Sequence, residues 1–222
     1  MTSNSQDGIS IRVMTPKDYE SVKSILQNDF FGAEPLSEFC GKDFYFKNKE
    51  VMDEWMLSMI EQDMCLLALD ENDGWRPVGC VLSGIQTPED IEKHSRTTET
   101  SEGSALRKIN ILFNKIESES NIFEVYGISK ALISHVTAVT ASKRGKGLGA
   151  RLAAALMDLG RSKVLPVMVA NCTSYYSARQ KKALGMKCIY SLNYADFKDD
   201  QGTVIFKPSA PHTTARVMAI KL

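Results

Sequence analysis

Residues 139–152 have the sequence Val-Thr-Ala-Ser-Lys-Arg-Gly-Lys-Gly-Leu-Gly-Ala-Arg-Leu, and this stretch decides the fold. The apolar, β-branched run of residues 133–140 predicts a strand, and the alanine- and leucine-rich residues 152–159 predict a helix. Glycine lacks a Cβ, so the loop's N–H groups can close around an anion, and the helix N-terminus attracts negative charge. Strand, basic glycine loop and helix together predict a phosphate-binding site.

The glycine spacing narrows the class of phosphate site. Gly145, Gly147 and Gly149 alternate with single residues, which differs from the P-loop pattern and from Gly-x-Gly-x-x-Gly. The loop instead matches Arg/Gln-x-x-Gly-x-Gly/Ala, beginning at Arg144 and preceded by a strand that ends in Val139. This pattern resembles the coenzyme A pyrophosphate loop of the Gcn5-related N-acetyltransferase (GNAT) superfamily. The alternative for the loop alone is a basic surface turn before a helix.

The composition gives no indication of a nucleic-acid or membrane partner. Lys plus Arg equals Asp plus Glu, at 27 each in 222 residues. Five cysteines are scattered without paired spacing, which favours a reducing compartment, and no apolar run approaches the length of a membrane span. The three histidines lie far apart in the sequence, so we expect no metal site. We expect a flexible tail over residues 1–8 and a single cytoplasmic domain over residues 9–222.

Residue periodicity and turn signals predict the remaining elements. We expect Gly160 to end the helix that follows the glycine loop. Over residues 86–104 we expect a loop with a short helix after Pro88. Further strands are predicted over residues 9–14, 64–69, 78–85, 164–170, 188–194 and 213–220. Further helices are predicted from residue 16 to about 28–31, and over residues 48–62, 105–119, 121–126 and 173–184.

A glutamate lies in an apolar stretch near the N-terminus. Residues 30–36 are Phe-Phe-Gly-Ala-Glu-Pro-Leu, and Pro35 biases Glu34 away from helical conformation. Apolar surroundings disfavour the charged carboxylate, which raises its pKa and suits it to general base catalysis near neutral pH. A solvent-facing loop glutamate is the alternative from these residues alone.

Hydroxyl side chains follow the predicted strand at residues 164–170. Thr173 and Ser177 are four residues apart and would share one face of a helix. Such hydroxyls either cap the helix or hydrogen-bond a substrate, and capping suits Thr173 or Ser174 but not Ser177. His135 lies in the strand before the glycine loop, and both a structural and a catalytic role stay open for it.

Taken together, these motifs resemble insect arylalkylamine N-acetyltransferases, a GNAT family. That family carries Phe-Phe-x-x-Glu-Pro-Leu, Arg-Gly-x-Gly-x-Gly, a Ser/Thr-x-x-x-Ser pair before Ala-Arg, and Phe-Lys-Pro-x-Ala-Pro-His. The corresponding segments here are residues 30–36, 144–149, 173–179 and 206–212, so the resemblance covers nearly the whole chain. It implies the α/β (α+β) GNAT acyl-CoA N-acyltransferase fold. In this fold a mixed, mostly antiparallel sheet of about seven strands is flanked by helices, with a splay between two central parallel strands.

The resemblance also implies the reaction and its residues. The co-substrate would be acetyl-CoA, without a metal, and the acceptor the primary amine of arylalkylamines such as dopamine, tyramine, octopamine or serotonin. Glu34 would be the general base, Thr173 would handle the amine, and Ser177 would protonate the thiolate. Residues implied to bind acetyl-CoA are Val139, Arg144, Gly145, Lys146, Gly147, Leu148 and Gly149, and those implied to bind the amine are Phe31, Pro35 and Leu36. We expect a monomer with no nucleic-acid or membrane partner.

Two departures from the family pattern concern the mechanism. The first hydroxyl is usually serine, whereas Thr173 adds a methyl group. Many GNAT enzymes place a general-acid tyrosine where Lys181 stands, which leaves Tyr175, Tyr176, Ser177 or solvent to protonate the thiolate. Two alternatives stay open for the function. One is a same-fold enzyme for a polyamine, a hydrazine or a small aliphatic amine, and the other is a non-catalytic acyl-CoA-binding module.

Overall fold

The computed structural model describes residues 7–40, 48–100 and 105–222, so residues 1–6 of the expected tail lie outside the described residues. The strands are β1 (Ile9–Val13), β2 (Leu66–Asp70), β3 (Arg76–Gln86), β4 (Ala131–Val139), β5 (Val167–Cys172), β6 (Lys187–Asn193) and β7 (Thr214–Lys221). The α-helices are α1 (Tyr19–Ile25), α2 (Pro35–Cys40), α4 (Lys49–Ile60), α5 (Pro88–Thr100), α6 (Ala105–Ser120), α7 (Ile122–Tyr126), α8 (Leu148–Ser162) and α9 (Tyr175–Ala183). Short helical turns are η1 (Pro16–Asp18), the π-helix η2 (Leu26–Phe31), η3 (Glu71–Asp73), η4 (Ala141–Lys143) and η5 (Tyr194–Asp196).

One seven-stranded sheet organises these elements, in the order β1-β2-β3-β4-β5-β7-β6. β4 and β5 run parallel and all other neighbours are antiparallel, which confirms the mixed sheet expected from the sequence. The parallel pair is joined by α8, because parallel neighbours need a crossover connection. Its register runs from Leu132↔Met168 to Ser134↔Ala170, and the two strands separate beyond that point. The expected splay is therefore present between β4 and β5.

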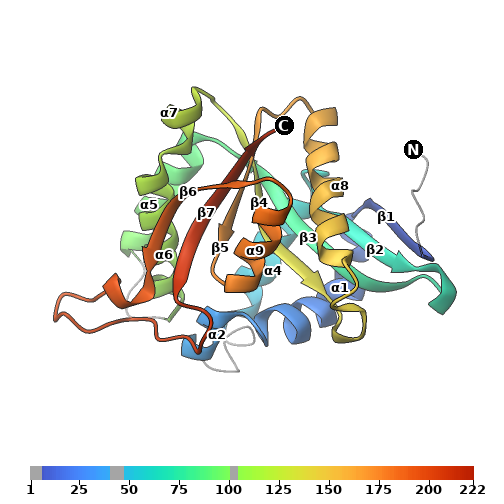
Figure 1. Cartoon of the computed structure of the whole chain (residues 1–222), viewed down its shortest axis with the longest axis horizontal. Helices are drawn as coiled ribbons and strands as arrows, with labels where there is room; N and C mark the ends of the chain where they lie inside the picture. The colour runs from blue at the N-terminus through green and yellow to red at the C-terminus, as the bar shows by residue number, and fades with distance from the viewer. Residues whose placement is uncertain (1–6, 41–47, 101–104) are drawn as a thin grey trace.

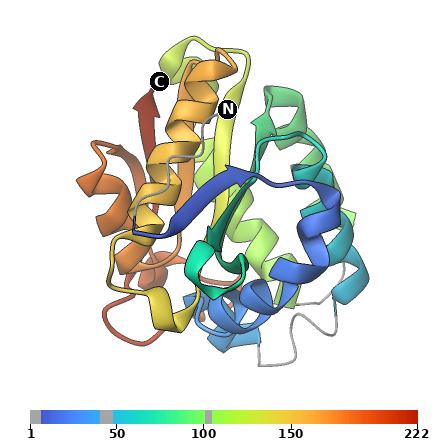
Figure 2. The same cartoon turned by 90° about the vertical axis from the view of Figure 1, so that its right-hand side faces the viewer.

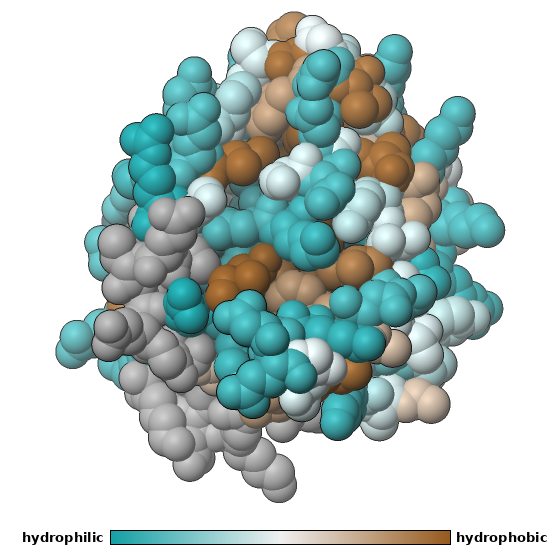
Figure 3. Space-filling view, turned by 90° about the vertical axis from the view of Figure 1, so that its left-hand side faces the viewer, coloured by the Kyte–Doolittle hydropathy of each residue, from teal (hydrophilic) through white to brown (hydrophobic). Residues whose placement is uncertain are grey.

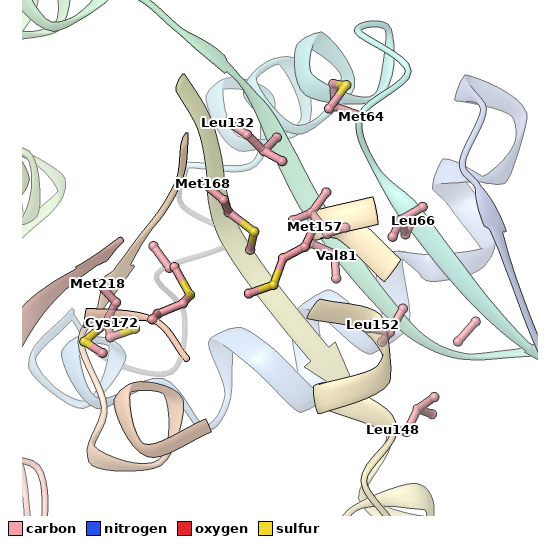
Figure 4. Close-up of a cluster of buried hydrophobic side chains, with 14 of the residues drawn as sticks. Met64, Leu66, Val81, Leu132, Leu148, Leu152, Met157, Met168, Cys172 and Met218 are labelled. Atoms are coloured by element: carbon pink, nitrogen blue, oxygen red, sulfur yellow. The ribbon is translucent and has the colours of Figure 1, made fainter. Parts of the chain in front are cut away.

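Helices cover both faces of this sheet (Figures 1 and 2). In Figure 2, α8 lies on one side of the strands and the blue helix α1 lies on the other. β2 is buried on both faces, so its residues alternate between two cores: Leu66 and Ala68 pack with α8, and Leu67 and Leu69 pack with α1 and α4. Figure 4 shows the α8 side of the core, where helix residues and strand residues meet, among them Leu148, Leu152 and Met157 on the helix and Leu132 and Met168 on the strands.

An irregularity in β4 lies beside the splay. The register with β3 shifts between Leu82 and Ser83, so that Ser134 and Val136 have β3 partners and His135 between them has none. Such a bulge locally reorients the side chains of a strand. The His135 ring makes an edge contact with Trp55 of α4, at 5.5 Å between ring centroids.

Two expectations from the sequence are wrong in detail. Gly160 lies inside α8 and does not end it. A Cβ at this position would be 2.8 Å from Leu132 Cδ2 and 2.5 Å from Leu222 Cδ1, so the lack of a side chain permits close packing. The interval after Pro88 forms a 13-residue helix, α5. Asp90 Oδ2 accepts from the Thr87 N–H at 2.9 Å, and this cap with Pro88 in the first turn favours helix initiation.

The surface has few large exposed apolar side chains in the described part of the chain. Figure 3 shows the face on the left of Figure 1 as mainly hydrophilic, with smaller hydrophobic patches between polar residues. Across residues 7–40, 48–100 and 105–222, none of the helices combines the length and apolar character that crossing a membrane requires.

Candidate active site

The glycine loop forms an open cradle at the N-terminus of α8. Gly145 and Gly147 have φ values of +74° and +79°, which residues other than glycine rarely adopt. Gly147 is also the N-cap residue of α8. In the part of the chain that the structure describes, no atom beyond the adjacent residues lies within 4 Å of the position that a Cβ would take at either glycine. Free N–H groups at the start of a 15-residue helix therefore face open space, as an anion site requires.

The basic side chains of the loop serve different purposes. Arg144 holds the loop in place: its Nε donates to the Val139 carbonyl at 3.0 Å, and its guanidinium also donates to the Asp29 carbonyl at 2.6 Å. Asp29 Oδ1 accepts from the Ala141 N–H at 2.9 Å, which ties the π-helix η2 to the same loop. Lys143 pairs with Asp70, and Lys146 is exposed. Arg144 and Lys143 thus shape the cradle, and Lys146 remains accessible from solvent.

A single cavity of about 930 Å³ extends from this cradle to Glu34. Its walls come from the segment around η2, from β4 and the glycine loop, and from β5 and α9. Ten of the residues implied by the family resemblance line it: Glu34, Pro35, Val139, Arg144, Gly145, Gly147, Leu148, Gly149, Thr173 and Ser177. Of the remaining three, Lys146 lies outside the lining, Phe31 packs beside Phe30, and Leu36 is buried in the core with α6.

Glu34 is anchored through one carboxylate oxygen. Its Oε2 accepts from the Ser37 N–H at 2.9 Å and from the Ser37 hydroxyl at 3.3 Å, so the side chain caps α2. Oε1 is buried and makes no hydrogen bond with the described residues. Burial raises the pKa of Glu34, although the hydroxyl of Thr173 and the Ser37 groups partly offset this effect. Ser37 thus holds one oxygen of the carboxyl group, and the other has no hydrogen-bond partner among the described residues.

Thr173 lies next to Glu34, and its main chain is held by Tyr194 of η5, the turn that follows β6. The Tyr194 hydroxyl donates to the Thr173 carbonyl at 2.7 Å. Burial raises the pKa of Tyr194, and the nearby Glu34 carboxylate acts in the same direction, so the phenol stays a donor at neutral pH. Thr173 precedes α9, whose N-cap is Ser174, so the expected helix face shared by Thr173 and Ser177 is wrong. Tyr194 has no local sequence signal and is a residue that the sequence analysis missed.

Ser177 lies in the first turn of α9. Ser174 Oγ accepts from the Ser177 N–H at 3.0 Å, and the Ser177 hydroxyl is within 3.0 Å of the Ser174 carbonyl, to which it donates. His212, from the proline-marked connection, accepts from the Tyr175 N–H through Nδ1 at 3.2 Å and lines the cavity. His212 therefore brings the connection between β6 and β7 to one side of the cavity.

A group of polar residues on β5, α5 and α6 lies beside the cavity. Asn171 lines the cavity, and its Nδ2 donates to Glu117 Oε1 at 2.9 Å. Glu117 Oε2 is 3.8 Å from His94 Nδ1, and this contact raises the pKa of His94. Burial lowers the pKa of His135 to about 4, so this imidazole is neutral at pH 7. A cavity of about 10 Å³ beside Asn171 and Glu117 has room for roughly one water.

Lys181 on α9 and Cys172 at the end of β5 both line the cavity and lie close to each other. Lys181 is buried on α9, and its Nζ donates to Thr137 Oγ1 at 3.4 Å. Cys172 at the end of β5 is also buried, and burial raises the pKa of its thiol.

No protein-family model matches the sequence. A solved mosquito arylalkylamine N-acetyltransferase-like 5b is 26% identical, with a TM-score of 0.86 over 96% of this chain and 100% of that one. A Drosophila melanogaster polyamine N-acetyltransferase that forms N-acetylagmatine is 25% identical, with a TM-score of 0.86 over 96% and 100%. An agmatine N-acetyltransferase variant is 24% identical, with a TM-score of 0.88 over 97% and 100%. The chain therefore has the GNAT fold, and over nearly its whole length it resembles insect arylalkylamine and polyamine N-acetyltransferases.

Proposed function

We propose that the chain is an acetyl-CoA-dependent N-acetyltransferase that acetylates the primary amine of arylalkylamines, with Glu34 as general base. The observation that carries this proposal is the single cavity that joins the glycine cradle to Glu34. An anion site and a buried, partly unpartnered carboxylate at two ends of one cavity fit a reaction between a phosphate-bearing acyl donor and a cationic acceptor.

The acyl-donor end of the cavity is the loop from Arg144 to Gly149 with the start of α8. Its two left-handed glycines leave the space that a pyrophosphate needs. Thr140 N donates to the Val78 carbonyl at 3.0 Å, toward β3. Since successive N–H groups of a strand point to opposite edges, the Val139 N–H points toward β5, where the strands have separated. This N–H is placed to donate to the oxygen of a tetrahedral intermediate.

The acceptor end of the cavity is formed by Glu34, Thr173 and Asn171. Glu34 Oε1 is the available acceptor for a substrate ammonium, and the raised pKa of this carboxyl suits it to take a proton near neutral pH. The neutral amine then attacks the thioester carbon directly, in a ternary complex. A covalent acetyl-cysteine is disfavoured, because the Cys172 thiol is 2% exposed and its pKa is raised.

Two acceptor classes fit the comparisons. The apolar and aromatic walls at Phe30, Ala33 and Pro35 favour an aromatic ring, as does Tyr176 on α9. The second candidate is a dication such as agmatine or a polyamine, which the buried carboxylate of Glu117 favours. We prefer the first, because Glu117 is already hydrogen-bonded to Asn171, lies beside His94 and does not line the main cavity. That the enzyme acts as a cytoplasmic monomer stays a prediction from the sequence.

An acceptor panel tests this proposal. Purified protein is incubated with acetyl-CoA and each of tyramine, dopamine, serotonin, phenethylamine, agmatine and putrescine, and release of the CoA thiol is followed. The expected result is that kcat/KM is highest for the aromatic monoamines. Highest values for agmatine or putrescine would favour the dication. CoA binding without thiol release for every amine would contradict the enzymatic function and indicate a binding module.

A further inference from the structure

Lys181 is a basic residue in the protein interior, where charged side chains are rarely found. Its side chain is 3% exposed, and no carboxylate of the described residues lies within ion-pair distance. The one hydrogen bond that its Nζ makes with the described residues, to Thr137, is long at 3.4 Å. A buried, unpaired ammonium lowers folding stability, so a position that retains one calls for a reason beyond packing.

The surroundings of Lys181 indicate which ligand would offset this cost. Lys181 lines the main cavity on the α9 side, one helical turn after Ser177. Thr137 and Cys172 lie across from it, where β4 and β5 have separated. The ammonium thus lies between the acyl-donor end and the acceptor end. Also among the cavity-lining groups, the Ser134 hydroxyl is buried without a hydrogen-bond partner in the described part of the chain.

We propose that Lys181 is the catalytic group that stabilises and protonates the thiolate leaving group of CoA. This inference rests on the proposed acetyl transfer and deepens it. The thiolate is the anion that the reaction itself generates, and it appears where the thioester lies, in the splay. The phosphates of the acyl donor are bound elsewhere, at the glycine cradle, so they do not supply the missing counter-charge.

The acidity of Lys181 fits this role. Burial lowers its pKa to about 8, although nearby Cys172 acts in the opposite direction. Ordinary thiols have a pKa of about 8.5, so the ammonium and the leaving thiol are closely matched, as efficient general acid catalysis requires. Cys172 on β5 is the titratable group that faces Lys181, while Arg216 on β7 and Cys188 on β6 act on Cys172. Because burial raises the Cys172 pKa, this thiol stays neutral and does not supply the counter-charge.

Ser177 alone is a weaker candidate for the same step. Its hydroxyl accepts from the Ser174 hydroxyl at 2.9 Å and donates to the Ser174 carbonyl at 3.0 Å. Both serines are neutral alcohols, so a proton given up by Ser177 must finally be recovered from another group. Lys181 lies on the same helix face and carries a proton that it can release. Ser177 is therefore better suited to orient the sulfur, with Lys181 as the proton source.

The protons balance in this scheme. Glu34 takes one proton from the substrate ammonium, the amine nitrogen forms the C–N bond, and the C–S bond breaks with its electron pair on sulfur. The thiolate takes a proton from Lys181, and the second proton of the nitrogen leaves to solvent. When the products leave, Glu34 releases its proton to solvent and Lys181 takes up one proton from solvent. The net products are the amide, the CoA thiol and one proton.

The experiment compares Lys181→Met and Lys181→Arg with the matched control Lys182→Met, whose lysine is the exposed neighbour on the same helix. We expect Lys181→Met to lower kcat by about 10²- to 10³-fold and to leave the amine KM and the CoA affinity nearly unchanged. Wild-type kcat should fall as pH rises and Lys181 loses its proton. Lys181→Arg should keep part of the activity and shift that fall to higher pH, because its guanidinium does not titrate there.

A second measurement needs no amine, so it separates this inference from the proposed function. The ultraviolet absorbance of the thiolate reports the thiol pKa of bound CoA, which should be lower in wild type than in Lys181→Met. Thermal unfolding should show Lys181→Met to be at least as stable as wild type, since an unpaired charge is removed. Equal thiol pKa values and equal kcat would overturn the proposal. Lost CoA affinity would instead make Lys181 a CoA anchor, and lost thermal stability would make it a structural cation. Either result contradicts the proposal.

Discussion

The two ends of the cavity are built in different ways. At the acyl-donor end, one continuous segment from β4 through the glycine loop into α8 supplies the cradle, and we propose that its main-chain N–H groups bind the acyl donor. At the acceptor end, Glu34, Thr173 and Asn171 are side chains from segments about 140 residues apart in the sequence, held by contacts such as Ser37 to Glu34 and Tyr194 to Thr173. One end depends on backbone conformation and the other on a few functional groups.

This difference predicts which kinds of substitution abolish the function of each end of the cavity. A main-chain cradle loses its function when the backbone conformation changes, either at a glycine or through loss of a side chain such as Arg144 that holds the loop. A side-chain site loses its function when one functional group is removed, although the backbone stays intact. Variants at the two ends should therefore affect different kinetic quantities.

The largest effect is expected at the acceptor end. Glu34→Gln keeps an oxygen that can accept from the Ser37 N–H but cannot take a proton from the substrate. We expect kcat to fall by about 10²-fold or more, with acetyl-CoA affinity unchanged. Steady-state kinetics with tyramine and calorimetric titration of acetyl-CoA measure the two quantities. Glu89→Gln, an exposed glutamate at the start of α5, is the control and should behave as wild type.

A smaller effect is expected at the acyl-donor end. Gly147→Val places a β-branched residue at a φ of +79° and a side chain in the open cradle. Strain of about 1–3 kcal/mol should weaken acetyl-CoA binding roughly tenfold to a hundredfold, with kcat at saturating acetyl-CoA less affected. Gly127→Val is the matched control, because Gly127 has a φ of +63° and open surroundings but lies after α7, away from the cavity. An unchanged acetyl-CoA affinity in Gly147→Val would remove the loop from the binding site.

The smallest effect concerns stability and pH. Because burial raises the pKa of Glu34, the folded chain holds this proton more tightly than the unfolded chain does. The stabilisation is complete below the ordinary glutamate pKa and is lost as pH rises through the raised value. We expect Glu34→Gln to have a higher Tm than wild type above this window and a similar Tm below it. A Tm difference that does not vary with pH would show that Glu34 is not buried as a carboxyl group.

The same contrast explains how far the sequence alone predicts the molecule. The strand, glycine loop and helix of residues 131–162 are local features, so periodicity and glycine spacing predict them well. The preference of glycine for helix ends predicts a helix terminus at Gly160, and this prediction fails because the residues that it packs against, Leu132 and Leu222, are distant in sequence. The proximity of Glu34 and Thr173 is predictable only from the resemblance to a family, because no local pattern encodes a contact between segments this far apart.

Other site features depend on burial that composition does not reveal. Lys181 is a charged residue in a polar helix, and its isolation from carboxylates emerges only when α9 packs against the sheet. The bulge that leaves His135 unpaired depends on the register of β3 against β4, which the sequence of either strand does not fix. The bonds of Asn171 with Glu117 and of Tyr194 with Thr173 likewise join separate elements.

The central claim is that one cavity holds two separable half-sites, and a crossed measurement on Glu34→Gln and Gly147→Val tests it most directly. The acetyl-CoA dissociation constant and kcat at saturating acetyl-CoA are determined for both variants. We predict that Glu34→Gln lowers kcat at unchanged acetyl-CoA affinity, and that Gly147→Val mainly lowers acetyl-CoA affinity. Near-normal kcat in Glu34→Gln, or parallel changes of both quantities in both variants, would contradict the account.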